Sequence, residues 1–165
     1  METWGIHVAK EYLKFSCAHF LIFPDGTTER LHGHNYRVYV DVQAGLSEFG
    51  LVIDFNKIKP VIRKICDDLD EHWLVPGKHH VLTVNERSDG VTEVRYKDLY
   101  YAAPTSNVIV MPLNNISSEN LATWIGRLLL QRLGECFPDA PVDGLTLAVE
   151  ETQGQRGFYR YSAES

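Results

Sequence analysis

Residues 31–40 read LHGHNYRVYV, with two histidines one residue apart at the start and a run rich in tyrosine and valine after them. Tyrosine and valine favour extended structure, so we expect a strand over about residues 34–44. Because successive side chains of an extended chain point to opposite faces, His32 and His34 would project from one face, about 6.6 Å apart. Two imidazoles placed in this way can bind one metal ion, so the stretch predicts a strand and part of a metal site.

A third histidine, His19, lies upstream in the segment FSCAHF, residues 15–20. We expect a strand over about residues 5–20, in which Cys17 and His19 share a face. Three histidines with an open fourth position are typical of a catalytic zinc ion. Cys17 is either a fourth ligand or reactive thiol, or a small buried residue, as free cysteines often are. The alternative to a metal site is a chance His-x-His pair on a polar strand face.

Further along the chain, hydrophobic spacing and turn residues predict two helices, a hairpin and a final strand. These elements are a helix over 55–69 capped by Asp54, a hairpin over 81–96, a helix starting at Ser117 or Ser118, and a strand over 144–152. Their order favours an α+β fold, with two helices on one face of a largely antiparallel sheet. At 165 residues, we expect the chain to form a single domain over 1–165.

The composition is that of a soluble globular protein, with 44% hydrophobic and 23% charged residues. A net charge of −6 argues against nucleic acid as the partner. The sequence has no basic-then-apolar leader, and no apolar run reaches the ~20 residues that span a membrane. The three cysteines are odd in number and lack CxxC spacing, which suits a reducing compartment. We therefore expect a cytoplasmic protein with no nucleic-acid or membrane partner.

Three carboxylates and a further histidine could supply acid–base or binding chemistry. Glu29 lies three residues before His32 and is either a general base or a solvated loop acid. Asp70 and His72, expected at the end of the first helix, are either an acid–base pair in which the aspartate orients the histidine, or ordinary polar residues of a helix end. Glu151 could accept two parallel hydrogen bonds from an amidine-like edge, such as that of a pterin or guanine, unless it is an exposed strand acid.

Taken together, these blocks resemble the family of 6-pyruvoyl-tetrahydropterin synthases and 6-carboxy-tetrahydropterin synthases. The resemblance follows the family's order and spans nearly the whole chain. The blocks that carry it are FSCAH at 15–19, LHGHNY at 31–36, GLVIDF at 50–55, LD at 69–70, SSENLA at 117–122 and ET at 151–152.

The resemblance implies the tunnelling fold, in which oligomerisation closes sheets into a barrel and two trimers stack into a homo-hexamer. It implies a zinc ion held by His19, His32 and His34. It also implies a pterin substrate anchored by Glu151, with the Ser117-Ser118 segment lining the same pocket. The family's substrate is 7,8-dihydroneopterin triphosphate.

The chain departs from the family pattern at three places. Family members usually carry a catalytic cysteine shortly before the His-Gly-His run, whereas this chain has Glu29 there. That arrangement resembles a branch associated with side-chain cleavage to 6-hydroxymethyl-dihydropterin. Asp70 is followed by Glu71, so that His72 is displaced by one residue, which is a rotation of about 100° on a helix. The stretch 75–111 is longer than in the short bacterial members.

We therefore expect a zinc-dependent lyase acting on 7,8-dihydroneopterin triphosphate or a related pterin. Glu29 would transfer the proton, with Asp70 and His72 as further catalytic candidates. Proton abstraction at carbon favours loss of triphosphate, and deprotonation of a hydroxyl favours C–C cleavage, so the product is left open. One alternative is a non-catalytic protein that binds zinc and pterin. Another is a cupin-like metal protein, although cupins carry a glutamate where this chain has Val38 and Tyr39.

Overall fold

The computed structural model describes residues 2–163, which form two compact units. The first unit contains the N-terminal segment up to Phe15, the segment Tyr36–Asp68 and the C-terminal part from Ser118. The second unit contains Ser16–Asn35 and Leu69–Ser117. Two strands, β2 (Lys14–His19) and β3 (His32–Ala44), contribute residues to both units.

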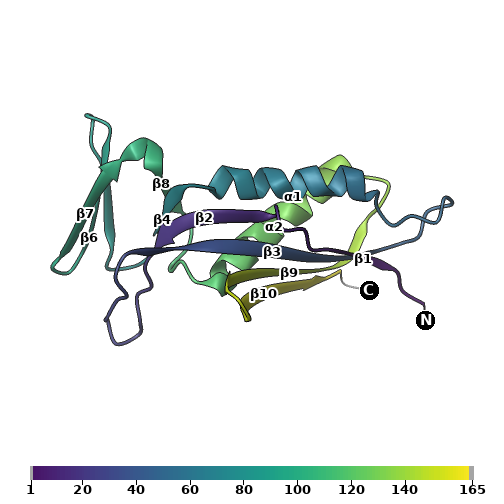
Figure 1. The fold of residues 1–165 in the computed structure, drawn as a ribbon, viewed down its shortest axis with the longest axis horizontal. Helices are drawn as coiled ribbons and strands as arrows, with labels where there is room; N and C mark the ends of the chain where they lie inside the picture. Colours follow the sequence, from purple (N-terminus) through teal and green to yellow (C-terminus); the bar gives the residue numbers. More distant parts are fainter. Residues whose placement is uncertain (1, 164–165) are drawn as a thin grey trace. The chain divides into compact units, whose positions relative to one another are not determined.

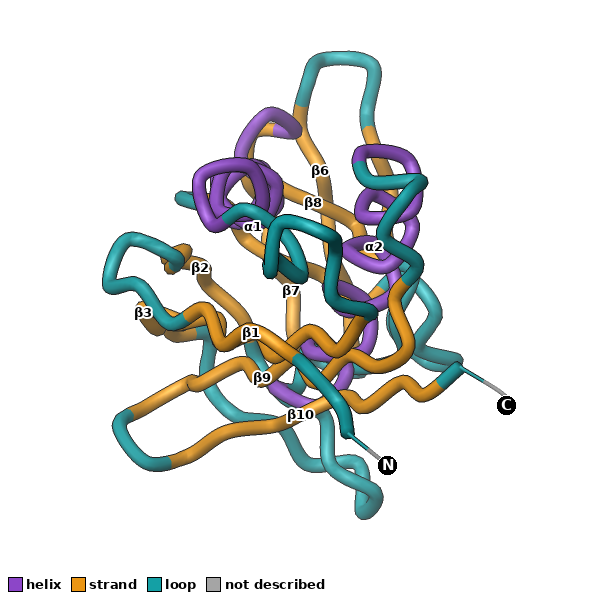
Figure 2. Tube along the Cα trace, turned by 90° about the vertical axis from the view of Figure 1, so that its right-hand side faces the viewer, coloured by secondary structure: helices purple, strands orange, loops and turns teal. Residues whose placement is uncertain are grey.

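The first unit is an antiparallel sheet with two helices. Its strands are β1 (Gly5–Val8), β3, β9 (Val142–Thr152) and β10 (Gln155–Ser162), in the order β10-β9-β3 with β1 also paired to β3. The helices α1 (Phe55–Leu69) and α2 (Ser118–Cys136) lie on the same side of β9 and β10 (Figures 1 and 2). Two helices on one face of this sheet are what the sequence predicts.

Both helices begin where their sequence signals place them. The Asp54 carboxylate accepts a hydrogen bond from the Asn56 N–H at 2.8 Å, which satisfies one of the free donors at the start of α1. Ser118 is the first residue of α2. At Gly157 of β10, an added Cβ would collide with the backbone of Ser118 and Glu119, so a glycine is needed for α2 to approach the sheet this closely.

The second unit contains parallel strands, which the sequence does not predict. Here β2 pairs in parallel with β4 (His72–Pro76), and β4 pairs in parallel with β8 (Val108–Met111). The expectation of a largely antiparallel sheet is therefore wrong for this unit. Both β4 and β8 are short apolar runs without alternation, a pattern that cannot be told from buried helix or loop.

A separate three-stranded antiparallel sheet completes the second unit. It consists of β5 (Thr83–Glu86), β6 (Val91–Tyr96) and β7 (Leu99–Pro104), followed by a 3₁₀ turn, η1 (Thr105–Asn107). The expected hairpin is confirmed, and β7 extends it by a strand. One face of this sheet joins a buried cluster formed by Phe20, Ile22, Trp73, Val75, Leu82, Val94 and Tyr96.

Two further expectations need correction. The stretch 5–20 is not one strand, because a turn after Val8 separates β1 from β2. The strand over 144–152 is present as β9 but is followed by β10, so it is not the last. None of the helices in the described residues is long and apolar enough to cross a membrane.

Candidate functional site

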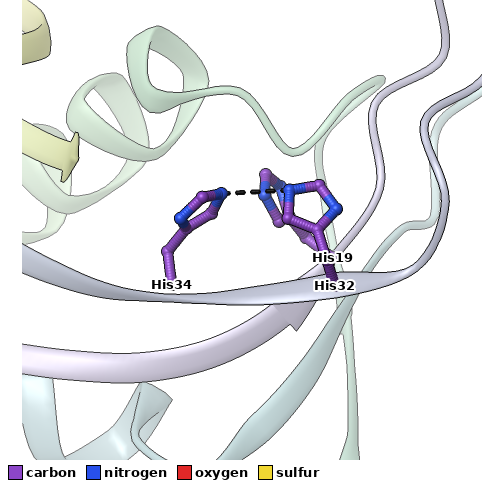
Figure 3. Close-up of side chains that lie close together, drawn as sticks. All are labelled: His19, His32 and His34. Carbon is purple, nitrogen blue, oxygen red and sulfur yellow. Dashed lines mark hydrogen bonds between the residues drawn. The ribbon is translucent and has the colours of Figure 1, made fainter.

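Three histidines converge in the second unit. One ring nitrogen from each of His19, His32 and His34 lies within 4.8 Å of the others, and Figure 3 shows the three rings grouped above β3. The His32 and His34 Nε2 atoms are 3.0 Å apart. His19 is fully buried, and the other two are half-buried. Strand alternation predicts this grouping, because His32 and His34 continue the face of β3 that is buried further along the strand.

Backbone carbonyl groups orient two of the rings. His19 Nδ1–H donates to the Ile116 carbonyl oxygen at 2.9 Å, and His32 Nδ1–H donates to the Arg30 carbonyl oxygen at 2.6 Å. A carbonyl can only accept, so the proton of each neutral ring sits on Nδ1 and the Nε2 lone pair is left for a metal. A tetrahedral zinc with Zn–N bonds of about 2.0–2.1 Å needs nitrogens about 3.3 Å apart, close to the observed His32–His34 separation. The His32–His34 pair therefore has a spacing that suits zinc, and the His19 nitrogen lies within 4.8 Å of both.

Glu29 lies beside this group. Its Oε2 atom is 3.8 Å from His32 Nε2 and accepts a hydrogen bond from the Leu21 N–H at 3.2 Å. Its own N–H donates to the Leu21 carbonyl at 3.0 Å. The sequence leaves open a general base beside a metal or a solvated loop acid, and the structure places the half-buried carboxylate 3.8 Å from the Nε2 atom of the candidate ligand His32.

A short hairpin positions Glu29. In residues 21–29, Leu21 pairs with Glu29, Ile22 forms a bridge with Thr28, and the Phe23 N–H donates to the Thr27 carbonyl. Gly26 at the hairpin tip has a backbone φ of +83°, a conformation that residues with a side chain rarely adopt. We call residues 21–29 the Glu29 hairpin.

Asp70 and His72 do not form the expected carboxylate–imidazole pair. Helix α1 ends at Leu69, Glu71 takes a left-handed φ of 59°, and His72 is the first residue of β4. The Asp70 carboxylate instead accepts from the Ser16 N–H at 2.6 Å, and His72 Nδ1–H donates to the Asp70 backbone carbonyl at 2.7 Å. Asp70 directly follows the last helical residue, as expected, whereas placing His72 at the helix end was wrong, because the left-handed Glu71 separates it from the helix and it opens β4.

Cys17 is buried on the same face of β2 as His19, and it lies opposite His72 in the β2–β4 register. It is not part of the three-residue metal group found among residues 2–163. A cavity of about 710 Å³ lies nearby, with Cys17, His34, His72 and Trp73 in its lining. That volume suits a small-molecule ligand.

Glu151 lies on β9 in the first unit and is half-buried. Its Oε1 accepts a hydrogen bond from the hydroxyl of the buried Tyr36 at 3.0 Å. Sequence reasoning missed Tyr36, because no local pattern signals a contact between residues 115 apart. Ser117 directly precedes α2, and Ser118 opens it.

Glu150 is unexpectedly buried on the opposite face of the same strand. Its side chain accepts hydrogen bonds from Arg156 Nε at 2.5 Å and from the Tyr39 hydroxyl at 3.2 Å. The hydrogen bond from Arg156 is the main reason that the pKa of Glu150 lies below its ordinary value, even though burial opposes the shift. Glu150 is therefore a paired structural acid.

The chain is similar to known proteins over most of its length. The model of the family described as 6-pyruvoyl tetrahydropterin synthase matches residues 7–162. A protein of Methanocaldococcus jannaschii, described as a putative 6-carboxy-5,6,7,8-tetrahydropterin synthase, is 31% identical over 97% of this chain and 95% of its own length. The 6-carboxy-5,6,7,8-tetrahydropterin synthase of Haemophilus influenzae is 35% identical over 54% of this chain and 62% of its own.

Solved structures show the same fold. The crystal structure of 6-pyruvoyl tetrahydropterin synthase from Plasmodium vivax matches with a TM-score of 0.91 and 27% identity, over 99% of this chain and 100% of that one. A second structure of the P. vivax protein, with a TM-score of 0.90 and 26% identity over the same shares, carries alanine in place of a glutamate described as a catalytic residue.

Proposed function

Because this chain belongs to the 6-pyruvoyl tetrahydropterin synthase family, we propose that it is a zinc-dependent lyase acting on 7,8-dihydroneopterin triphosphate or a related pterin. The observation that carries the proposal is the three-histidine group with the Glu29 carboxylate 3.8 Å from His32 Nε2. Membership of this family removes the cupin-like alternative. The non-catalytic binder is left as the competing function.

In the proposed reaction, Glu29 moves a proton. When bound by the three histidines, zinc supplies Lewis-acid polarisation of oxygen atoms on the pterin side chain. The Glu29 carboxylate takes a proton from the adjacent C–H or O–H group and returns it as the product forms. Removal of a C–H proton leads to loss of triphosphate, and removal of an O–H proton leads to C–C cleavage. The glutamate described as catalytic in the P. vivax relative supports this role for Glu29.

Glu151 is proposed to anchor the pterin ring. A carboxylate can accept two parallel N–H bonds from the amidine-like edge of a pterin, which fixes the ring's orientation. The Tyr36 hydroxyl holds the Glu151 carboxylate from one side. The Ser117-Ser118 segment is proposed to line the same pocket, and Asp70 and His72 are proposed to contribute acid–base groups by way of the cavity that His72 lines.

The assembly and location are also proposals. We expect a homo-hexamer of two stacked trimers, with the barrel formed by oligomerisation. The sequence has three cysteines, an odd number without CxxC spacing, which suits the reducing, cytoplasmic location that we propose.

Incubation of the zinc-loaded protein with 7,8-dihydroneopterin triphosphate tests the function directly. We expect turnover, with products identified by mass as pyruvoyl, carboxy or hydroxymethyl pterin. A His32→Ala, His34→Ala double variant is the control for metal dependence. Pterin binding without any product would instead identify a non-catalytic binder.

A further inference from the structure

The β5–β6–β7 sheet contacts the Glu29 hairpin at two places. One is apolar, because Ile22 of the hairpin and its neighbour Phe20 lie in the same buried cluster as Leu82, Val94 and Tyr96 of the sheet segment. The other is polar and involves the hairpin's tip. All of these residues belong to the second unit.

Two donors from the end of β6 meet a single acceptor at the hairpin tip. The Tyr96 hydroxyl donates to the Gly26 carbonyl oxygen at 3.0 Å, and Lys97 Nζ donates to the same oxygen at 2.8 Å. Tyr96 is 4% exposed, so its hydroxyl is held by a ring packed in the core. Lys97 lies in the turn between β6 and β7 and has a left-handed φ of 51°.

Asn115 holds the other edge of the hairpin. Its side chain accepts from the Ile22 N–H at 3.2 Å and donates to the Ile22 carbonyl at 2.8 Å. The next residue, Ile116, supplies the carbonyl that orients His19. The hairpin is thus fixed at its base near the histidines, while its tip is fixed by the sheet.

We propose that Tyr96 and Lys97 are positioning residues for Glu29: they clamp the hairpin tip through the Gly26 carbonyl and so hold the Glu29 carboxylate beside His32. This inference rests on the proposed function. Glu29 follows Gly26 by three residues, about 10 Å along an extended chain. A swing of an unclamped tip therefore moves the carboxylate, and a misplacement of about 1 Å costs up to about 10²-fold in rate.

The clamp can be removed without disturbing the core. A Tyr96→Phe, Lys97→Met double variant keeps the ring and the aliphatic stem but removes both donors to Gly26. A Tyr100→Phe, Arg95→Met double variant is the matched control, because it removes the same kinds of group from the same sheet. Tyr100 bonds to Glu93 and Arg95 stacks on the Tyr100 ring, and neither contact involves the hairpin.

The first readout is independent of activity. We expect the backbone amides of Phe23, Gly26 and Glu29, which donate within the hairpin, to exchange hydrogen about tenfold faster in the clamp variant. The loss of the two hydrogen bonds to Gly26 can supply a change of this size. The control variant should exchange like the wild type, and both should keep a full complement of zinc. Unchanged exchange at these amides in the clamp variant would overturn the clamp.

The second readout is kinetic. Because the Leu21 N–H still holds the Glu29 carboxylate at the base of the hairpin, we expect kcat of the clamp variant to fall only about tenfold, with KM unchanged. When the clamp substitutions are added to Glu29→Gln, we expect kcat to stay at the value of Glu29→Gln alone. Equal losses with and without the Glu29 carboxylate, or faster exchange with unchanged kcat, would overturn the positioning role. Wild-type turnover in Glu29→Gln alone would refute the proposed role of Glu29, whereas the exchange data would still decide whether the tip is clamped.

Discussion

The Ile116 and Arg30 carbonyl groups select which nitrogen of His19 and His32 faces the candidate metal site. A metal-binding histidine usually donates its other N–H to such a partner, which fixes both the tautomer and the ring orientation. In the second unit, these contacts come from backbone, so side-chain substitution at Ile116 or Arg30 leaves them in place. The three histidines themselves are therefore the positions at which we expect mutation to affect metal binding.

We predict that His32→Ala removes most of the zinc, because two imidazoles seldom retain the metal tightly. Metal content after dialysis should fall well below one zinc per chain. His7→Ala is a suitable control, since His7 is an exposed residue that bonds Asp41 in the first unit. Full zinc content in His32→Ala would refute the assignment of the ligands.

We predict that Glu29→Gln lowers turnover by roughly 10²–10⁴-fold, the usual cost of a lost general base, while zinc stays bound. The amide keeps the size of the side chain but cannot take up a proton. Glu86→Gln, an exposed change on β5, should have no effect. If Glu29→Gln turned over normally and Cys17→Ala did not, the buried thiol on β2 would be the catalyst.

Sequence patterns locate groups that share a strand, and they fail where a single unusual backbone angle intervenes. Alternation along β2 and β3 was enough to place the histidines together. The geometry between Asp70 and His72 was left open, because a left-handed residue such as Glu71 cannot be read from the sequence. The Tyr36–Glu151 contact joins two strands far apart in the chain, and no local signal exists for it.

At the scale of elements, the Glu150–Arg156 pair links β9 to β10 on the face opposite Glu151. The pKa of Glu150 is lowered on folding, so the stability it contributes is present above the ordinary glutamate pKa of about 4.3 and is lost as pH falls through the lowered value. We predict that Glu150→Gln lowers Tm at pH 7 and shows a smaller further drop between pH 5 and pH 3 than the wild type. Thermal melts at several pH values check this, with the exposed Glu11→Gln as control.

An equal loss of Tm on acidification in Glu150→Gln and the wild type would contradict this account of the pair. Arg156 also stacks over the Tyr39 ring, with its guanidinium carbon 3.8 Å from the ring centre. That contact survives in Glu150→Gln, so the variant isolates the charge of the carboxylate from the packing around it.

We predict that the β5–β6 turn tolerates shortening. Arg87–Gly90 is exposed, the Arg87 side chain pairs with Asp89 and Glu93, and the Gly90 carbonyl accepts one hydrogen bond from the Thr105 N–H at 2.8 Å. Such turns are replaced at little cost in stability. Replacing residues 87–90 with Asn-Gly should leave zinc content unchanged and Tm nearly so. Loss of zinc in this variant would mean that the turn supports the site. The opposite end of the sheet, at Tyr96, is the part that reaches the Glu29 hairpin.

Helices and strands with a strong hydrophobic periodicity could be predicted from the sequence, and those without it could not. Both helices and β3 carry strong patterns and were placed within a few residues. β4 and β8 were missed because their short apolar runs carry no alternation. The parallel pairing of β4 with β2 on one side and β8 on the other is not revealed by the sequence.

At the scale of the whole molecule, β2 and β3 each supply residues to both compact units. A strand cannot easily melt in one half and persist in the other, so the single-domain expectation predicts one cooperative unfolding transition. The two helices lie in the first unit, and Trp73 lies in the second. In a Trp4→Phe, Trp124→Phe variant, we predict that helix circular dichroism and Trp73 fluorescence give coincident urea transitions. Two separated midpoints would show that the units unfold independently.

The contact between His19 and Ile116 also has a consequence for the nascent chain. All three histidines have been synthesised once residue 34 is added, yet the carbonyl that orients His19 follows it by 97 residues. Ile116 is added 82 residues after His34, so at ribosomal speeds of about 5–20 residues per second the delay after the last histidine is about 4–16 s. During this interval the emerging polypeptide carries the ligands without the oriented site, so ordered metal capture belongs to a late stage of translation or follows release from the ribosome.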